Sequence, residues 1–76
     1  MDKRRLLDLS GEVCPYTFVK TKLALEDLRP GDYLQIFVDN QPAAQNVPRS
    51  ATREGHQVVS VTQEGHGWSI LLRCKA

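Results

Sequence analysis

The chain has 76 residues and a mass of 8.6 kDa, which predicts one domain over residues 1–76, because two domains would each be too small to bury a core. A net charge of +1 with 41% hydrophobic and 25% charged residues is unlike a disordered chain or a basic nucleic-acid binder. No apolar run approaches the about 20 residues of a membrane span. The charged start, Met1–Arg5, lacks a signal-peptide pattern, so we expect a cytoplasmic protein whose two cysteines are thiols.

The first part of the chain reads as a strand followed by a helix. Residues 6–10 place Leu7 and Leu9 on one face of a short strand, and residues 11–13 leave it as a loop. Cys14 and Pro15 then open a helix, because proline is favoured at the first helical position. Small or apolar side chains recur at spacings of three and four and predict an amphipathic helix that ends before residues 29–32: Phe18, Thr21, Ala24, Leu25 and Leu28.

The middle of the chain repeats this order. Residues 33–38 alternate as a strand, and the segment that follows starts a helix with Asn40 as its cap. We expect this second helix over residues 42–54. Pro48 should interrupt it, so that the main helix begins near Val47, and Gly55 should end it.

The last part predicts a hairpin. Residues 57–63 form the third strand, with Val59 and Val61 alternating against polar neighbours. Residues 64–67 are the turn, and residues 68–74 are the fourth strand.

The order β-α-β-α-β-β predicts an α/β two-layer sandwich (α+β), with a mixed four-stranded sheet and both helices on one face. The helices lie on one side if the chain keeps its direction of travel along the sheet. The expected core from the strands is Leu7, Leu9, Leu34, Ile36, Val38, Val59, Val61, Ile70 and Leu72, facing Phe18, Leu25, Leu28 and Ala51 from the helices.

Cys14 is the residue with the clearest chemical potential. It lies between a predicted strand and a predicted helix. A helix N-terminus carries partial positive charge and unpaired N–H groups, which stabilise a thiolate, and Lys20 and Lys22 add positive charge nearby. The alternative is that Cys14 is a small buried core residue that happens to precede a proline.

The other cysteine and the histidines have mainly structural readings. Cys74 is in phase with Ile70 and Leu72, which favours burial, with a resolving thiol for Cys14 as the functional alternative. His56 and His66 could join the two cysteines in a zinc site only in principle, because no two of the four have the close spacing of a ligand pair. We therefore expect no metal and no cofactor.

The sheet face away from the helices is expected to be open. It would show Tyr33, Phe37, Leu71 and Val58. Such a cluster is either a partner surface or the ordinary surface hydrophobicity of a small domain.

Several short motifs occur in an order that is specific when taken together. They are Cys14-Pro15-Tyr16-Thr17 before the amphipathic helix, Leu28-Arg29-Pro30-Gly31-Asp32 after it, Asp39-Asn40, Asn46-Val47-Pro48, and Glu54-Gly55-His56. From about Leu7 to Arg73 the chain resembles the TusA/SirA family of small sulfur carriers. That resemblance implies a single β-α-β-α-β-β domain, similar to the C-terminal domain of bacterial translation initiation factor three.

The resemblance also implies a function. In the family's Cys-Pro-x-Pro motif, the cysteine receives sulfur as a persulfide from a cysteine desulfurase or another sulfurtransferase. It passes the sulfur to an acceptor protein for tRNA thiolation, molybdenum-cofactor work or sulfur oxidation. By this match Cys14 carries the sulfur and Pro15 is the first motif proline.

Thr17 departs from the motif, because it stands where the family usually has its second proline. A threonine supplies an N–H and a hydroxyl that proline lacks, in a turn where N–H groups have no intrahelical partner. Either Thr17 gives the Cys14 sulfur an extra donor, or the change is neutral.

Two other functions stay open at this point. One is a small RNA- or protein-binding regulatory module of the same fold, with a basic patch from Lys3, Arg4, Arg5, Arg49 and Arg53, although the low net charge makes nucleic acid an improbable partner. The other is a thiol redox protein that uses Cys14 and Cys74.

Overall fold

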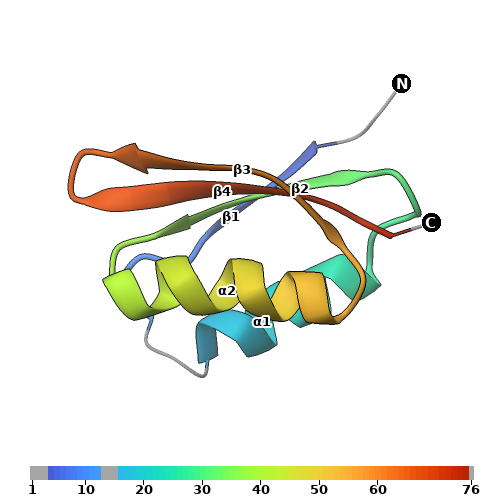
Figure 1. Ribbon diagram of the computed structural model, residues 1–76, viewed down its shortest axis with the longest axis horizontal. Coiled ribbons are helices and arrows are strands. Elements are labelled where there is room, and N and C mark those ends of the chain that lie inside the picture. The colour runs from blue at the N-terminus through green and yellow to red at the C-terminus, as the bar shows by residue number, and fades with distance from the viewer. Residues whose placement is uncertain (1–3, 13–15, 76) are drawn as a thin grey trace.

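The computed structural model describes residues 4–12 and 16–75 and shows two layers (Figure 1). The elements follow the order β1 (Arg4–Asp8), α1 (Tyr16–Glu26), β2 (Tyr33–Val38), α2 (Gln41–Arg53), β3 (Gln57–Glu64) and β4 (Gly67–Arg73). Both helices cover the same face of one four-stranded sheet. The predicted two-layer sandwich is confirmed. The helix start expected at Cys14 and Pro15 lies outside the described residues.

The sheet is mixed, and its strand order is β1-β2-β4-β3. β1 pairs with β2 in parallel, and β4 lies between β2 and β3, antiparallel to both. The chain therefore moves in one direction from β1 through β2 to β3. Right-handed crossovers then place both helices on one side.

The core lies between the sheet and the helices. The fully buried strand residues include Leu34, Ile36, Val38, Ile70 and Leu72. From the helices, the buried residues are Thr17, Thr21, Ala24 and Leu25 in α1 and Ala43, Ala44, Val47 and Ala51 in α2. Phe18 and Leu28 are only partly buried. The core of α2 is built from small side chains, so this helix packs close to the sheet.

Pro48 does not interrupt α2, which corrects the expectation from the sequence. The helix runs without a break from Gln41 to Arg53 with Pro48 inside it. A proline inside a helix forfeits one main-chain hydrogen bond, but here Val47 and Ala51 on either side are buried against the core. Their packing outweighs the missing bond.

The ends of α2 agree with the sequence. Asn40 caps its start, because its side chain accepts a hydrogen bond from the Ala43 N–H at 2.9 Å. At the other end Gly55 has a φ of 94°, and the N–H groups of Gly55 and His56 bond back to the carbonyls of Thr52 and Ala51. This is a Schellman motif, which needs the left-handed glycine.

β3 differs most from the prediction. The register between β3 and β4 shifts between Val58 and Ser60, which marks a β-bulge. Val58 therefore pairs with the buried Leu72 and packs on the core, so it is not part of the open face. Val59 and Val61 are nearly half exposed instead of buried. The bulge inserts one residue, and alternation read from the sequence alone carries no sign of it.

β1 also lies slightly earlier than expected, at residues 4–8 instead of 6–10. Leu9 is nevertheless buried, just beyond the strand, and its N–H bonds to the Phe37 carbonyl at 2.8 Å. Leu7 packs against the core, and Leu6 points to the opposite face with 72% of its surface exposed.

Candidate functional site

The loop after β1 leads towards Cys14 and Pro15, both of which lie outside the described residues. Its first turn is closed by Asp8, whose carboxylate accepts hydrogen bonds from the Ser10 hydroxyl at 2.6 Å and the Ser10 N–H at 3.0 Å. These two bonds lower the pKa of Asp8, because they favour its charged form. The Glu12 N–H then returns to the Leu9 carbonyl at 3.1 Å.

Asp39 and Asn40, which directly precede α2, hold this loop in place by hydrogen bonds. The Asp39 carboxylate accepts from the Gly11 N–H at 2.9 Å. The Asn40 amide donates to the Glu12 carbonyl at 2.9 Å while its oxygen caps α2. Glu12 also forms an ion pair with Lys20 of α1. The main chain at Gly11 and Glu12 is therefore held by the two residues before α2, and the Glu12 side chain is held by α1.

Thr17 lies in the first turn of α1 and has no exposed surface. Its main-chain carbonyl accepts from the Thr21 hydroxyl at 2.7 Å. Its own hydroxyl oxygen is buried and has no hydrogen-bond partner among the described residues. Position 17, where the resemblance expects a second proline, thus holds a polar group inside the core.

The outward side of α1 is apolar, which the sequence analysis missed. Tyr16, Val19 and Leu23 recur at helical spacing and are 60%, 47% and 57% exposed. We call these three residues the outer α1 stripe. It begins at the first described residue of the helix. The helical spacing of these three residues is visible in the sequence. The small and apolar residues on the other side of α1 are already sufficient to predict a helix, so the sequence analysis did not use the outer ones.

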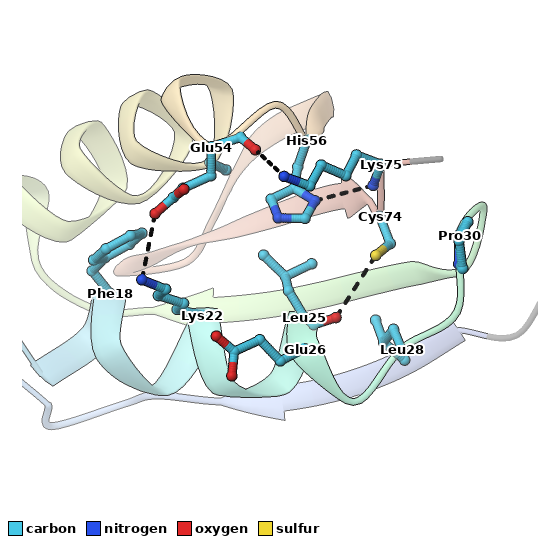
Figure 2. Close-up of a pocket in the computed structure, with 11 residues that line it drawn as sticks. Phe18, Lys22, Leu25, Glu26, Leu28, Pro30, Glu54, His56, Cys74 and Lys75 are labelled. Atoms are coloured by element: carbon cyan, nitrogen blue, oxygen red, sulfur yellow. Dashed lines mark hydrogen bonds and ion pairs between the residues drawn. The ribbon is translucent and has the colours of Figure 1, made fainter.

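A pocket lies between the helices, towards the end of the helix layer where α1 and α2 finish (Figure 2). It has a volume of about 290 Å³ and is bounded by α1, the end of α2 and the end of β4. The Lys22–Glu54 ion pair, at 3.6 Å, joins the two helices beside it. Cys74 borders the pocket and is buried, with its thiol donating to the Leu25 carbonyl at an S–O distance of 3.7 Å.

His56 borders the same pocket and is hydrogen-bonded to Lys75, which follows β4. Its Nδ1 accepts a hydrogen bond from the Lys75 N–H at 3.1 Å, and Lys75 Nζ bonds to the Glu54 carbonyl at 3.0 Å. Burial lowers the pKa of His56, the Lys75 charge lowers it further, and Glu54 opposes the shift. His56 is therefore a neutral acceptor in this structure.

The burial expected for Cys74 is confirmed. Cys74 contacts the carbonyl of Leu25, near the end of α1. Leu25 is nine residues after Tyr16, so the two residues are about 14 Å apart along the helix axis. His66 is exposed in the turn between β3 and β4. Within residues 4–12 and 16–75, no group of three or more His, Cys, Asp or Glu side chains could hold a metal ion.

The described basic residues of the predicted patch do not gather on one surface, as an RNA-binding module would need. Arg4 lies on the sheet face away from the helices and bonds to Gln35, whereas Arg49 and Arg53 belong to α2 in the other layer. Arg5 is paired with Asp27 at 3.5 Å. Lys3 lies outside the described residues. No described helix has the length and apolar character needed to cross a membrane.

Comparison with known proteins gives a consistent result. Residues 5–74 match the family model described as sulfurtransferase TusA. The chain is 46% identical over 76 residues to a "Putative sulfur carrier protein" of Archaeoglobus fulgidus, covering 99% of this chain and 86% of that protein. A protein of the same description from Thermotoga maritima is 33% identical over 72 residues, covering 93% and 91%.

The fold comparison agrees. The crystal structure of a SirA-like protein from Desulfitobacterium hafniense superposes with a TM-score of 0.80 at 25% identity, covering 93% of this chain and 97% of that one. The match to the family model spans nearly the whole chain. The chain belongs to the TusA family and has the role of a sulfur carrier.

Proposed function

We propose that the protein relays sulfur between two other proteins as a persulfide on Cys14. The donor is a cysteine desulfurase or another sulfurtransferase. The Cys14 thiolate attacks the terminal sulfur of the donor persulfide, the S–S bond of the donor breaks, and the donor cysteine leaves as a thiolate. The acceptor protein later takes the same sulfur from Cys14 by a second exchange. No cofactor enters either step.

The observation that carries this proposal is the difference between the two cysteines. Cys74 is buried and its thiol is used as a hydrogen-bond donor within the core, so it lacks the access that thiolate chemistry requires. Cys14 occupies the motif position in a chain that matches the family over residues 5–74. A sulfur carrier with two cysteines therefore has Cys14 as its candidate.

The region around α1 supports the chemistry. Cys14 precedes Tyr16, the first described residue of α1, by two positions. The N–H groups and partial positive charge of a helix start stabilise a thiolate and a persulfide anion alike. Proline is favoured at the first position of a helix, which agrees with a supporting role for Pro15. Asp39 and Asn40 fix the incoming chain up to Glu12.

The outer α1 stripe supports a role with protein partners. Tyr16, Val19 and Leu23 expose apolar surface on the helix that follows Cys14. Exposed apolar clusters mark protein contacts. A donor or acceptor that covers this stripe would bring its own cysteine to the Cys14 segment. The expected cytoplasmic location fits such partners and stays a prediction.

The test is intact-mass spectrometry after incubation with a cysteine desulfurase and cysteine. Wild type should gain about 32 Da for each sulfur atom added. Cys74→Ser should gain the same mass, and Cys14→Ser should gain none while still folding, since serine is also a good N-cap. If the sulfur maps to Cys74, or Cys14→Ser charges fully, the proposal is wrong.

Thr17 is proposed as a supporting residue through its main-chain N–H. Thr17→Pro removes that donor and is tolerated in a first helical turn. The pKa of Cys14, measured from thiolate absorbance or alkylation rate against pH, should rise. An unchanged or lower pKa would show that position 17 supplies no useful donor.

A further inference from the structure

One face of the sheet lies opposite the helices (Figure 1), and the register of the strands arranges its residues in rows that cross the strands. Strand pairing aligns one row of Arg4, Tyr33, Arg73 and Gln57, a middle row of Leu6, Gln35, Leu71 and Ser60, and a third row of Asp8, Phe37, Ser69 and Thr62. We call this surface the open face. It has no cover among the described residues.

Charge changes sign along the open face. The first row carries Arg4 and Arg73, and the Arg73 guanidinium lies 5.9 Å from the centre of the Tyr33 ring. The third row carries Asp8, whose pKa is lowered by its bonds to Ser10, so its charge persists. Glu64 extends the acidic end beyond it. One end of the open face is positive and the other negative.

The apolar and polar side chains of the open face are suited to burial. Leu6 is 72% exposed, and Leu71 and Phe37 are half-buried. The polar groups between them already bond to one another, because Gln35 Nε2 donates to the Ser69 hydroxyl at 2.9 Å and Arg4 donates to the Gln35 amide oxygen at 3.5 Å. Covering satisfied polar groups costs less than covering unpaired ones.

We propose that the open face binds a second copy of this chain. In a symmetric pair the two faces are related by a two-fold axis. An axis that runs across the strands along the middle row places the positive row of each copy over the acidic row of the other. An axis along the strands would oppose like charges, so the charge pattern selects the first arrangement.

This arrangement specifies the contacts. β1 of one copy lies over β1 of the other, so Arg4 faces the partner's Asp8 twice, by symmetry. The middle row faces itself, which brings the two Leu6 side chains together at one side of the pair. Sheets packed in this way keep their strands within about 30° of each other. A nucleic acid is a poorer occupant, because its phosphates would meet the acidic row.

The size of the open face sets the strength of the pair. Four strands span about 19 Å and six residues along a strand about 20 Å, so each copy contributes an area of about 400 Å². A stable interface takes about 800 Å² from each partner. The pair is therefore weak. Salt should weaken it further, because its Arg4–Asp8 pairs lie at the rim.

The pair leaves the helix layer outside. The outer α1 stripe belongs to that layer, so sulfur exchange and self-association use opposite sides of the molecule. This makes the inference independent of the proposed function. Leu6→Asp should remove the pair without changing sulfur charging of Cys14, whereas Leu23→Asp in the outer α1 stripe should slow charging without changing the pair.

The first experiment is sedimentation from about 10 µM to about 1 mM protein at low and high salt. Wild type should pass from monomer to dimer, with at least tenfold weaker association at high salt. Leu6→Asp should stay monomeric, and Leu23→Asp, a leucine of similar exposure on the other layer, should dimerise like wild type. A monomer at every concentration, or a dimer that Leu6→Asp does not weaken, overturns the inference.

The second experiment tests the pairing itself. Arg4→Asp and Asp8→Arg should each be monomeric, because each places like charges opposite one another in both contacts. An equal mixture of the two variants restores opposite charges in both contacts, so it should form a mixed dimer of near wild-type affinity. A mixture that remains monomeric, while both variants keep the wild-type circular dichroism spectrum, contradicts the arrangement.

Discussion

Side chains meet the two ends of the helices in opposite ways. Where α2 begins, the Asn40 side chain accepts a hydrogen bond from the Ala43 N–H. Where the helices finish, the Cys74 thiol and Lys75 Nζ donate to the carbonyls of Leu25 and Glu54. The direction of both helices explains this, because N–H groups collect at one end and C=O groups at the other.

This difference bears on the proposed roles of the two cysteines. The Cys74 thiol donates to the Leu25 carbonyl beside the negative end of α1. An anionic sulfur is favoured at the start of a helix, where N–H groups are in excess. The proposal that Cys14 carries the sulfur, and Cys74 does not, agrees with this difference.

The largest expected effect tests how far the stability of the protein depends on packing at the end of the helix layer where α1 and α2 finish. Leu25→Ala removes a side chain that is 4% exposed, and such a truncation costs about 2–5 kcal/mol of unfolding free energy. Leu23→Ala, an exposed leucine on the same helix, should cost far less. Urea unfolding of both variants checks this, and equal midpoints would mean that the pocket end is not part of the core.

The next effect concerns the other end of the helix layer, where α2 begins. Asn40→Ala removes the cap and the link to Glu12, at a cost of about 1–2 kcal/mol, and should slow sulfur charging because the chain before Cys14 loses an anchor. Asn40→Asp keeps the cap acceptor but lacks the amide donor, so it should recover stability and not the charging rate. Recovery of both would show that the Glu12 contact is unimportant.

A smaller effect tests Thr17. Thr17→Val replaces an unpartnered buried hydroxyl by a methyl group of similar size, so the unfolding free energy should rise by about 1 kcal/mol. Thr21→Val is the matched control, because it removes a hydroxyl that is bonded to the Thr17 carbonyl and should not stabilise. Thermal melts distinguish the two, and a loss of stability in Thr17→Val would mean that its hydroxyl does find a partner.

The smallest effect is pH dependence at the pocket end. Folding lowers the pKa of His56 below its ordinary value of 6.5, so the unfolded chain takes up the proton first as the pH falls. Unfolding free energy should therefore decrease as the pH drops through about 6.5, until His56 also titrates in the folded state. Denaturant curves should show this slope in wild type and His66→Gln, and a reduced slope in His56→Gln.

The sequence predicted the order of elements and the side on which the helices lie, because periodicity and right-handed crossovers determine both. It could not locate the bulge near Val59, since one inserted residue leaves no signature in an alternating run. It also could not show that Pro48 stays within α2, because that depends on packing against a sheet that is distant in sequence.

The candidate site was less accessible to sequence reasoning. Cys14, Pro15 and Thr17 came from a motif, and their roles stay predictions. Asn40 was predicted only as a helix cap, because its second contact, with Glu12, joins residues 28 positions apart. A contact of that separation depends on the fold and cannot be read from spacing.

The bulge in β3 has a consequence for how the protein behaves at high concentration. β3 is an edge strand of eight residues with Val59 and Val61 exposed. In other proteins, an exposed apolar edge strand can pair with strands of further chains and so form fibres. The shift between Val58 and Ser60 breaks the regular spacing that another chain would need in order to add a strand, and it increases the local twist. Polymerisation through this edge is thereby hindered, and assembly can stop at closed pairs instead of growing into filaments.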